Sequence, residues 1–411
     1  MSGSNLYYIY LDTKITGALE QLIGYFQTQV FDSNKCIEVI CKYYKEIADI
    51  FKNAFIKHNI PFRFVRKQAD YKLDKGKVVL YLFNAQSNCR LVANRSLVHI
   101  FVTHGESHKL ASIKPIIRIY DYVVTSGNVG IDRFLKSGIF SPYDVQSGRI
   151  ITLGDTFLGS NEFHYNFDSN ALVYAPTWEG GVPEENYCSL QEVNINKIID
   201  FCNRELIKYV YIKPHPNLGH RDKNYLSKLK LAIKKIRKNG IFVFVCTPKN
   251  KKFNIFKFLL IAKNGDVKKI NDWGAVKFAI TDISAMEMQF IRKKIPCLTL
   301  IDRKYTNELY IPKRLNTYTS KTFFDANDCL SYDSESEKIR DELFDYFITY
   351  PSEEIAGMSY SDRIQWLCQY TTMHMRKKIN SSKKIIEHKM NVLLILTQLI
   401  LIDYCYATLH D

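Results

Sequence analysis

Short apolar runs alternate with longer amphipathic stretches along most of the chain. In the first half, the runs are apolar on both faces, as buried parallel strands are. The strands predicted from them are Leu6–Leu11, Val78–Phe83, Leu97–Thr103 and Tyr120–Ser126. Apolar residues at helical spacing predict a helix over Ile37–Lys57. This alternation is typical of a doubly wound α/β domain.

A second α/β series follows a looser stretch, residues 154–170, which is rich in Gly, Ser, Asn and Asp and indicates a connection between domains. The strands predicted beyond it are Ala171–Ala175, Val210–Lys213, Ile241–Val245, Val276–Ile280 and Ile295–Leu300. Helices are predicted over Asn224–Asn239, ended by Gly240, and over Ser284–Arg292. The sequence therefore predicts two Rossmann-like domains, over residues 1–165 and 166–334, that face a cleft at the carboxyl ends of their strands.

The remainder, residues 335–411, is predicted to be a helical tail. Its last part carries basic residues, which are Arg376, Lys377, Lys378, Lys383 and Lys384. The apolar run Val392–Ile402 follows them, and its eleven residues are too few to cross a bilayer, which takes about 20. Two interpretations stay open: a helix packed back on the protein, for example on the N-terminal domain, or an interfacial anchor that touches a membrane.

Charge narrows the classes of partner. The chain has 57 basic and 42 acidic residues, a net charge of +15, which favours nucleic acid, an acidic membrane face or a phosphorylated substrate. There is no zinc-finger spacing, RNP-like aromatic motif or long basic tail, so we expect no nucleic acid. The N-terminus lacks the basic start and apolar core of a signal peptide, which predicts a cytoplasmic protein.

Cysteine usage bears on metals and redox state. The ten cysteines are scattered without a CxxC pair, as expected of buried thiols in a reducing compartment. No DxD-like acidic pair stands near the segments described next, so we expect neither a metal nor a cofactor.

Polar, reactive residues directly follow several predicted strands. His104, Gly105, His108 and Lys109 follow the strand Leu97–Thr103. A histidine with a near-neutral pKa suits removal of a proton from an acceptor hydroxyl, so His104 is a candidate general base. A purely structural histidine is the alternative.

Two further segments follow strands of the second series. Thr177, Trp178 and Glu179 enter a glycine-rich loop, which could equally be a tight turn around a packed tryptophan. Lys213 and His215 lie in Lys213-Pro214-His215-Pro216, where the prolines fix the backbone. Lysine and histidine presented in this way suit the binding of phosphate oxygens, and a turn with one exposed histidine is the alternative.

The fourth segment begins the predicted helix Ser284–Arg292. Thr281, Asp282, Ser284 and Glu287 fall here, and Asp282 or Ser284 is a natural N-cap. Free amides and the helix dipole at such a start favour an anion, whereas capping alone explains the serine and aspartate equally well.

The four motifs HGESHK, YAPTWEG, YIKPHP and TDISA, in this order, resemble the CDP-glycerol glycerophosphotransferase family of teichoic-acid and capsule synthesis. The resemblance covers roughly residues 95–305, and YAPTW and KPHP are its most specific parts. It implies a GT-B fold with an acceptor-side N-terminal domain and a donor-binding C-terminal domain. It also implies a CDP-glycerol or CDP-polyol donor, a saccharide or lipid-linked acceptor, and peripheral contact with the cytoplasmic membrane.

The resemblance also implies roles for individual residues. His104 matches the family's general base, and His215 matches a histidine near the donor phosphates. The donor or phosphate side is assigned Lys213, Thr177, Thr281, Asp282, Ser284 and Glu287. The acceptor side or cleft is assigned Gly105, His108, Lys109, Trp178 and Glu179.

Several positions depart from the family pattern, among them the stretch Gly154-Asp155-Thr156-Phe157-Leu158, which lacks the family's arginine. Ala285 replaces a second phosphate-binding serine, and Glu179 stands where arginine is common. The acidic residue expected further along the helix is Gln289, which leaves open whether Glu287 holds the ribose instead.

The function expected from these residues is a single in-line displacement at the distal phosphorus of the donor, as a priming or linker-building step. A GT-B glycosyltransferase that uses a CMP- or UDP-sugar is the first alternative. A non-catalytic, membrane-bound assembly protein is the second.

Overall fold

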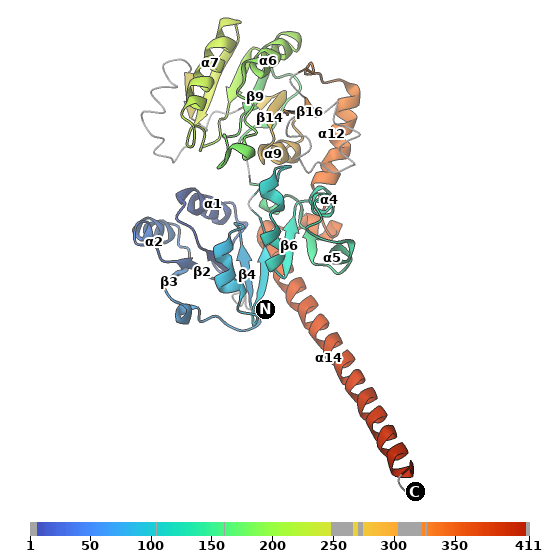
Figure 1. Cartoon of the computed structure of the whole chain (residues 1–411). Helices are drawn as coiled ribbons and strands as arrows, with labels where there is room; N and C mark the ends of the chain where they lie inside the picture. Colours follow the sequence, from blue (N-terminus) through green and yellow to red (C-terminus); the bar gives the residue numbers. More distant parts are fainter. Residues whose placement is uncertain are drawn as a thin grey trace.

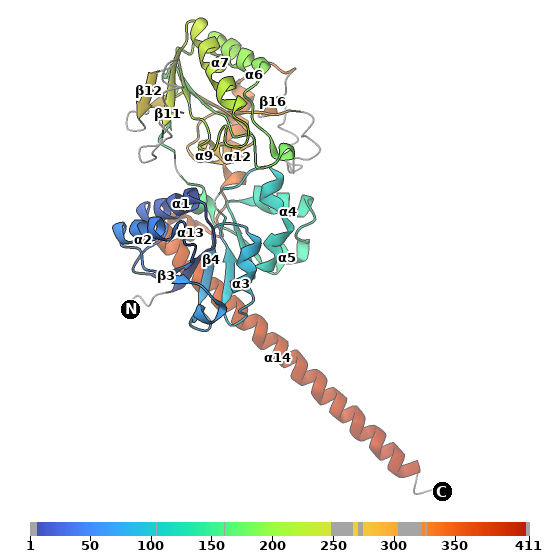
Figure 2. The same ribbon diagram turned by 60° about the vertical axis from the view of Figure 1, so that its left-hand side comes forward.

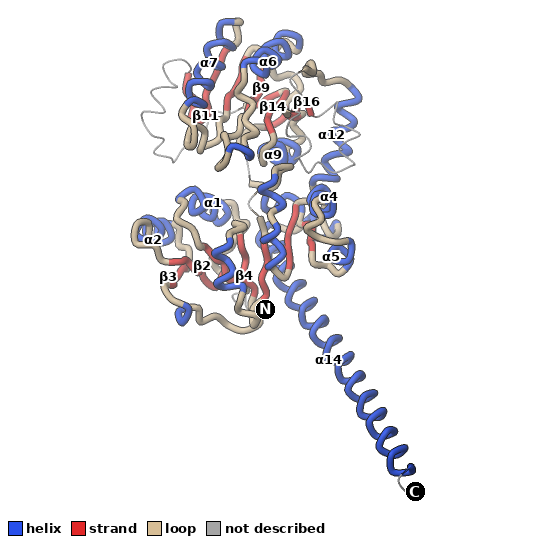
Figure 3. Tube along the Cα trace, viewed as in Figure 1, coloured by secondary structure: helices blue, strands red, loops and turns tan. Residues whose placement is uncertain are grey.

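The computed structural model describes residues 6–103, 105–159, 161–247, 266–269, 274–302, 323–324 and 327–407, and beyond residue 382 mainly the backbone. Two parallel sheets form two domains, which lie one above the other in Figure 1. Helices surround the strands of each domain (Figure 3).

The N-terminal sheet has the strand order β3-β2-β1-β4-β5-β6-β7, and every neighbouring pair is parallel. Its strands are β1 (Tyr7–Leu11), β2 (Cys36–Lys42), β3 (Phe62–Val65), β4 (Val78–Tyr81), β5 (Val98–Phe101), β6 (Tyr122–Thr125) and β7 (Ile150–Thr152). Its helices are α1 (Thr16–Gln27), α2 (Ala48–Lys57), α3 (Cys89–Val92), α4 (Asn128–Lys136) and α5 (Pro142–Gln146). One core packs the sheet against α1 and α2, and a second packs the opposite face against α3 and α4.

The helix predicted over Ile37–Lys57 is wrong in its first part, because strand β2 occupies Cys36–Lys42 and only Ala48–Lys57 is helical. Val39 and Ile40 lie fully buried in different cores, on the two faces of the sheet. A strand buried on both faces is a continuous apolar run, which cannot be told from a buried helix by periodicity alone. The β-branched residues of this run favour the strand.

The C-terminal sheet has the order β12-β11-β10-β9-β14-β15-β16, again parallel throughout. Its strands are β9 (Ala171–Ala175), β10 (Tyr209–Ile212), β11 (Phe242–Thr247), β12 (Asp266–Lys269), β14 (Phe278–Asp282), β15 (Cys297–Leu300) and β16 (Phe323–Phe324). Its helices are α6 (Glu192–Arg204), α7 (Asn224–Lys238) and α9 (Met286–Arg292), and the first two cover one face. The strand predicted over Val276–Ile280 is two elements, because β13 (Ala275–Val276) instead pairs with β8 (His164–Tyr165) of the connecting segment.

In both sheets the strand order reverses next to the first strand, between β1 and β4 and between β9 and β14. Such reversal points are where open α/β sheets bind ligands, at the carboxyl ends of the strands. The predicted fold class, two Rossmann-like domains of GT-B type with a helical tail, is confirmed.

The tail consists of α12 (Ser334–Phe347), α13 (Glu353–Gly357) and α14 (Tyr360–Ala407). Helix α12 contacts α9 and α4, so it bridges the two domains. The first turns of α14 pack into the N-terminal core through Ile364 and Leu367. The rest of α14 extends away from both domains in Figures 1 and 2. None of the helices in the described ranges is both long and apolar enough to cross a bilayer.

Asp155, in the connection between the domains, joins the C-terminal domain to the tail. Its carboxylate accepts hydrogen bonds from Tyr350 (2.7 Å), Arg363 (2.7 Å), Arg292 (2.9 Å) and Tyr360 (3.0 Å). Arg292 belongs to α9, whereas the other three donors belong to the tail. This network fixes α9, and therefore the strand that precedes it, relative to the tail and the N-terminal core.

Candidate active site

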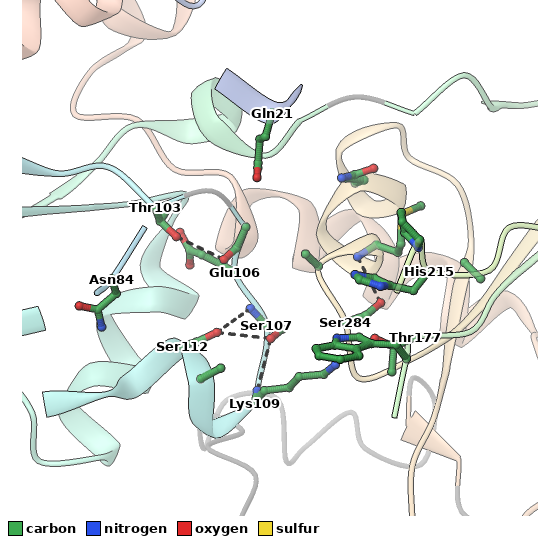
Figure 4. A pocket seen from close by; sticks show the side chains of 18 of the residues that line it. Gln21, Asn84, Thr103, Glu106, Ser107, Lys109, Ser112, Thr177, His215 and Ser284 are labelled. Atoms are coloured by element: carbon green, nitrogen blue, oxygen red, sulfur yellow. Dashed lines mark hydrogen bonds between the residues drawn. The ribbon is translucent and has the colours of Figure 1, made fainter. Parts of the chain in front are cut away.

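A cavity of about 400 Å³ lies between the two domains. Its N-terminal wall is formed by residues that follow β4, β5 and β6, and its C-terminal wall by residues that follow β9, β10 and β14. Figure 4 shows Asn84, Thr103 and Glu106 on one side and Thr177, His215 and Ser284 on the other. The predicted site residues that line the cavity are Gly105, Lys109, Thr177, Trp178, Lys213, His215 and Ser284. The order reversal between β9 and β14 places Thr177 and Ser284 side by side at the carboxyl edge of the sheet.

His104 lies outside the described residues. The residues on either side of it line the cavity, and both have unusual backbone angles: φ is 58° at Thr103 and 155° at Gly105. A β-branched residue at positive φ is strained, and such strain gathers at functional loops. A side chain at Gly105 would meet Ala285 of the opposite domain at 3.1 Å. Glycine therefore lets the two domains approach each other at this loop.

His215 faces the cavity in a fixed orientation. Its backbone amide donates to the carbonyl of Pro176 (3.0 Å), which joins the loops after β10 and β9. Its ring stacks on Trp178, with centroids 5.9 Å apart and planes inclined by 16°. The amide of Asn217 donates to Nδ1 (3.1 Å), so the proton of the neutral ring lies on Nε2. His215 is therefore set up as a hydrogen-bond donor through Nε2.

Glu179 supports the cavity wall but does not line it. Its carboxylate is fully buried and accepts from the amides of Gly219 (2.9 Å), Arg221 (2.8 Å) and Asp222 (3.0 Å). Burial alone would raise the pKa of Glu179, but these amide hydrogen bonds outweigh it and the pKa is lowered. The expected place of Glu179 in the cleft is corrected accordingly: it holds the Trp178 loop to the loop that carries His215.

Two lysines bring positive charge to the cavity from opposite domains. Lys109 donates to the hydroxyl of Thr177 (3.0 Å), a hydrogen bond between the domains. Lys213 lies 3.8 Å from the carboxylate of Glu162, which is itself 45% exposed. Burial lowers the pKa of both lysines. Both are placed to offset the charge of an anionic ligand.

The segment after β14 turns only part of its polar groups toward the cavity. Asp282 is fully buried and accepts from the amides of Thr177 (2.8 Å) and Ser189 (3.0 Å), so it is not the predicted N-cap. Burial raises the pKa of Asp282 to about 6. The buried Thr281 hydroxyl bonds the carbonyl of Ala175 (3.1 Å) and the hydroxyl of Ser284 (3.0 Å). Of Thr281, Asp282 and Ser284, only Ser284 lines the cavity. Asp282 and Thr281 instead hold the loops around Ser284 in position.

Helix α9 begins at Met286, two residues later than predicted. Within it, Glu287 points away from the cavity: one oxygen accepts from Thr299 (3.3 Å) and the other lies 3.7 Å from Nε2 of the buried His108. Glu287 and His108 therefore form a contact between the domains, and neither lines the cavity as expected. Gln289, one turn from Ala285, lines it instead.

Burial raises the pKa of Glu287 from 4.5 to about 7. Because the folded state binds the proton more tightly, the stability linked to this group is full below pH 4.5 and is lost as pH rises to about 7. We expect the free energy of unfolding of Glu287→Gln to fall less than that of the natural chain over this range. Denaturant titrations at a series of pH values measure it. Parallel curves for the two proteins would contradict the burial of an uncharged Glu287.

Sequence reasoning missed a buried ion pair in the N-terminal wall. Glu106 accepts from the hydroxyl of Thr125 (2.8 Å), the amide of Ser126 (2.6 Å) and Nη1 of Arg133 (3.1 Å). Arg133, on α4, is 1% exposed and lines the cavity together with Glu106 and Asn84. Asn84 directly follows a predicted strand, a signal that could have singled it out. Nothing in the local sequence links Arg133 to Glu106, which precedes it by 27 residues.

No group of three or more metal-binding side chains occurs within the described ranges. The side chains that line the two facing walls carry hydroxyl, imidazole, ammonium, guanidinium, carboxylate and amide groups.

A scan of protein-family models and a search of curated proteins find no match to this chain. Solved structures similar to it include UDP-GlcNAc 2-epimerase from Neisseria meningitidis bound to UDP-GlcNAc, with 11% identity, a TM-score of 0.42, and 90% of this chain and 99% of that one covered. Acinetobacter baumannii MurG has 9% identity and a TM-score of 0.37, with 92% and 99% covered. The lipopolysaccharide outer core galactosyltransferase WaaB has 10% identity and a TM-score of 0.39, with 92% and 100% covered. Likenesses this distant leave the activity of the chain to be argued from its own residues.

Proposed function

We propose that this chain transfers glycerol phosphate, or another polyol phosphate, from a CDP-linked donor such as CDP-glycerol to a saccharide or lipid-linked acceptor of a capsule or teichoic-acid-like polymer. One observation carries the proposal. All four motifs on which the family resemblance rests contribute residues to the same cavity, one from the N-terminal domain and three from the C-terminal domain.

The proposed reaction is an in-line displacement at the phosphorus that bears the glycerol. The acceptor oxygen forms a bond to this phosphorus as the bond to the oxygen bridging to CMP breaks, and CMP leaves. The acceptor proton passes to a base, for which the resemblance offers His104. Little covalent chemistry is asked of the protein, so positioning and electrostatic stabilisation supply most of the rate enhancement.

In this proposal the described residues have the following roles. Nε2–H of His215 donates to a phosphate oxygen, and the ammonium group of Lys213 offsets the phosphate charge. The Ser284 hydroxyl adds a donor beside them, and Thr177, tied to Lys109, lies at the junction of the two domains. We assign the ribose hydroxyls to Gln289, which lines the cavity.

The net charge of +15 and the basic residues of α14 support action at the cytoplasmic face of a membrane, where a lipid-linked acceptor would lie. In this part of the proposal the protein is cytoplasmic and binds the membrane peripherally.

Donor binding tests the proposal without an acceptor. CDP-glycerol is expected to raise the melting temperature of the natural chain, because a ligand that binds only the folded state stabilises it. Lys213→Met is expected to weaken this binding by about tenfold or more, since hydrogen bonds to charged groups are among the stronger ones.

Lys208→Met is the matched control, because Lys208 is exposed immediately before the same strand. It is expected to bind CDP-glycerol normally. If CDP-glycerol stabilises Lys213→Met as well as the natural chain, the role of Lys213 is wrong. If UDP- or CMP-sugars stabilise the protein and CDP-polyols do not, the donor class is wrong.

A further inference from the structure

The N-terminal wall of the cavity contains buried polar atoms whose hydrogen-bonding capacity is unused. Nη1 of Arg133 donates a hydrogen bond to Glu106, while its Nε and Nη2 have no hydrogen-bond partner in the described part of the chain. In Asn84, both the Nδ2 and the Oδ1 atoms are buried and equally without one. Both side chains line the cavity.

Unused donors and acceptors at such a position point to a ligand. A buried polar group without a partner is unfavourable, so folded proteins rarely keep one unless water or a ligand completes it. Arg133 cannot turn away, because Glu106 holds one end of its guanidinium group and is itself held by Thr125 and Ser126. Its remaining N–H groups are therefore presented in a fixed direction.

The remaining groups of this wall select the chemistry of the ligand. The charge of Arg133 is already offset by Glu106, so the pair Asn84 and Arg133 does not by itself favour an anion. Asn84 offers one donor and one acceptor group, and a hydroxyl can satisfy both, whereas a phosphate or carboxylate only accepts. Three apolar side chains, those of Phe101, Ile117 and Phe134, also line the cavity on this side. An apolar wall with a few fixed polar groups is typical of a small-molecule subsite.

We infer that Asn84 and Arg133 form a subsite for an uncharged, hydroxyl-bearing group, a sugar ring or polyol, which is the end of the acceptor that enters the cavity. This inference rests on the proposed function, in which the opposite wall holds the donor. Asn84 and Arg133 accordingly decide which hydroxyl-bearing acceptors are admitted. Their hydrogen bonds to the acceptor replace those to water.

The experiment measures the binding of glycerol and of a panel of methyl pyranosides by saturation-transfer NMR, with inorganic phosphate as a separate arm. The test variant is Asn84→Leu, which keeps the approximate size of the side chain and removes both polar groups. Asn84→Ser is the second variant, in case leucine disturbs the fold. The control is Asn128→Ala, because Asn128 is exposed on the same helix as Arg133.

At least one probe, glycerol or a methyl pyranoside, is expected to bind the natural chain and Asn128→Ala with equal affinity. The affinity of Asn84→Leu for the same probe is expected to be lower by about tenfold or more. Phosphate is expected not to displace it. The inference is overturned if none of these probes binds, if Asn84→Leu and Asn84→Ser bind them unchanged, or if phosphate binds with the same dependence on Asn84. The increase in melting temperature caused by CDP-glycerol is measured in parallel for Asn84→Leu and for the natural chain. If CDP-glycerol stabilises both proteins and the sugar-binding result fails, only this inference is wrong. If CDP-glycerol stabilises neither protein, the proposed function is wrong as well.

Discussion

Replacement of His215 by alanine is expected to lower the rate of transfer from CDP-glycerol by about 10²–10³-fold, the usual cost of losing one fixed hydrogen-bond donor to a charge that develops in the transition state. The amide of Asn217 donates to Nδ1, so in the neutral ring the proton lies on Nε2, the atom that is proposed to donate to a phosphate oxygen. Because His215 touches the cavity at the end of a loop, the loss is expected in turnover and not in folding. Steady-state release of CMP measures it.

Two further variants separate the role of His215 from simpler explanations. His215→Gln places an amide N–H near the former Nε2 and is expected to recover part of the lost rate, since the proposed role needs a donor and no proton transfer. His220→Ala, an exposed histidine of the same loop, is the matched control and is expected to be fully active. Normal turnover by His215→Ala would remove this residue from the site. Equal failure of the glutamine variant would favour proton transfer by the imidazole.

The substitution Asp155→Ala is expected to have the largest effect on stability, lowering the free energy of unfolding by about 3–5 kcal/mol. It leaves Arg292 and Arg363 without their shared carboxylate, and the side chain of Arg363 is only 8% exposed. The hydroxyl groups of Tyr350 and Tyr360 lose their acceptor at the same time. Urea titration of the purified variant measures the loss.

The same network predicts a dependence on pH. Burial alone would raise the pKa of Asp155, but the hydrogen bond from Tyr350 and the charges of Arg292 and Arg363 outweigh it and lower the pKa below 3.8. A lowered folded-state pKa contributes stability that is present above pH 3.8 and lost as pH falls through the folded value. The difference in the free energy of unfolding between the natural chain and Asp155→Ala should therefore become smaller in acid. Asp168→Ala is the control, because Asp168 is exposed. A decrease in its free energy of unfolding as large as that of Asp155→Ala would contradict this account.

The alternation of apolar runs predicted the two-domain parallel architecture, because strands such as β9 are buried along their whole length and stand out in the sequence. The prediction failed at Cys36–Lys42, where a short apolar run lies beside a true helix and the two were merged. Several of the residues that directly follow strands line the cavity. Their backbone leaves the sheet at its carboxyl edge, so Lys213 and Ser284 reach the cavity whatever the rest of the loop does.

What the sequence could not predict is the direction in which a side chain turns within such a loop. Glu179 directly follows the cavity-lining Trp178, and Asp282 lies two residues before the cavity-lining Ser284. Both side chains nevertheless turn inward and accept hydrogen bonds from backbone amides of distant loops. Arg133 was missed for the same reason, since its partner is set by the packing of α4 against β6 and not by spacing along the chain. Long-range hydrogen bonds of this kind are visible only once the strands are in register.

The most direct test of the central claim is the release of CMP from CDP-glycerol by the purified protein, with CDP-ribitol, CMP-sugars and UDP-sugars assayed beside it and an acceptor mixture supplied. The account predicts release from a CDP-polyol that depends on His215, with no turnover of UDP- or CMP-sugars. Turnover of a CMP- or UDP-sugar together with silence toward the CDP-polyols would contradict it, and would assign the cavity to glycosyl transfer.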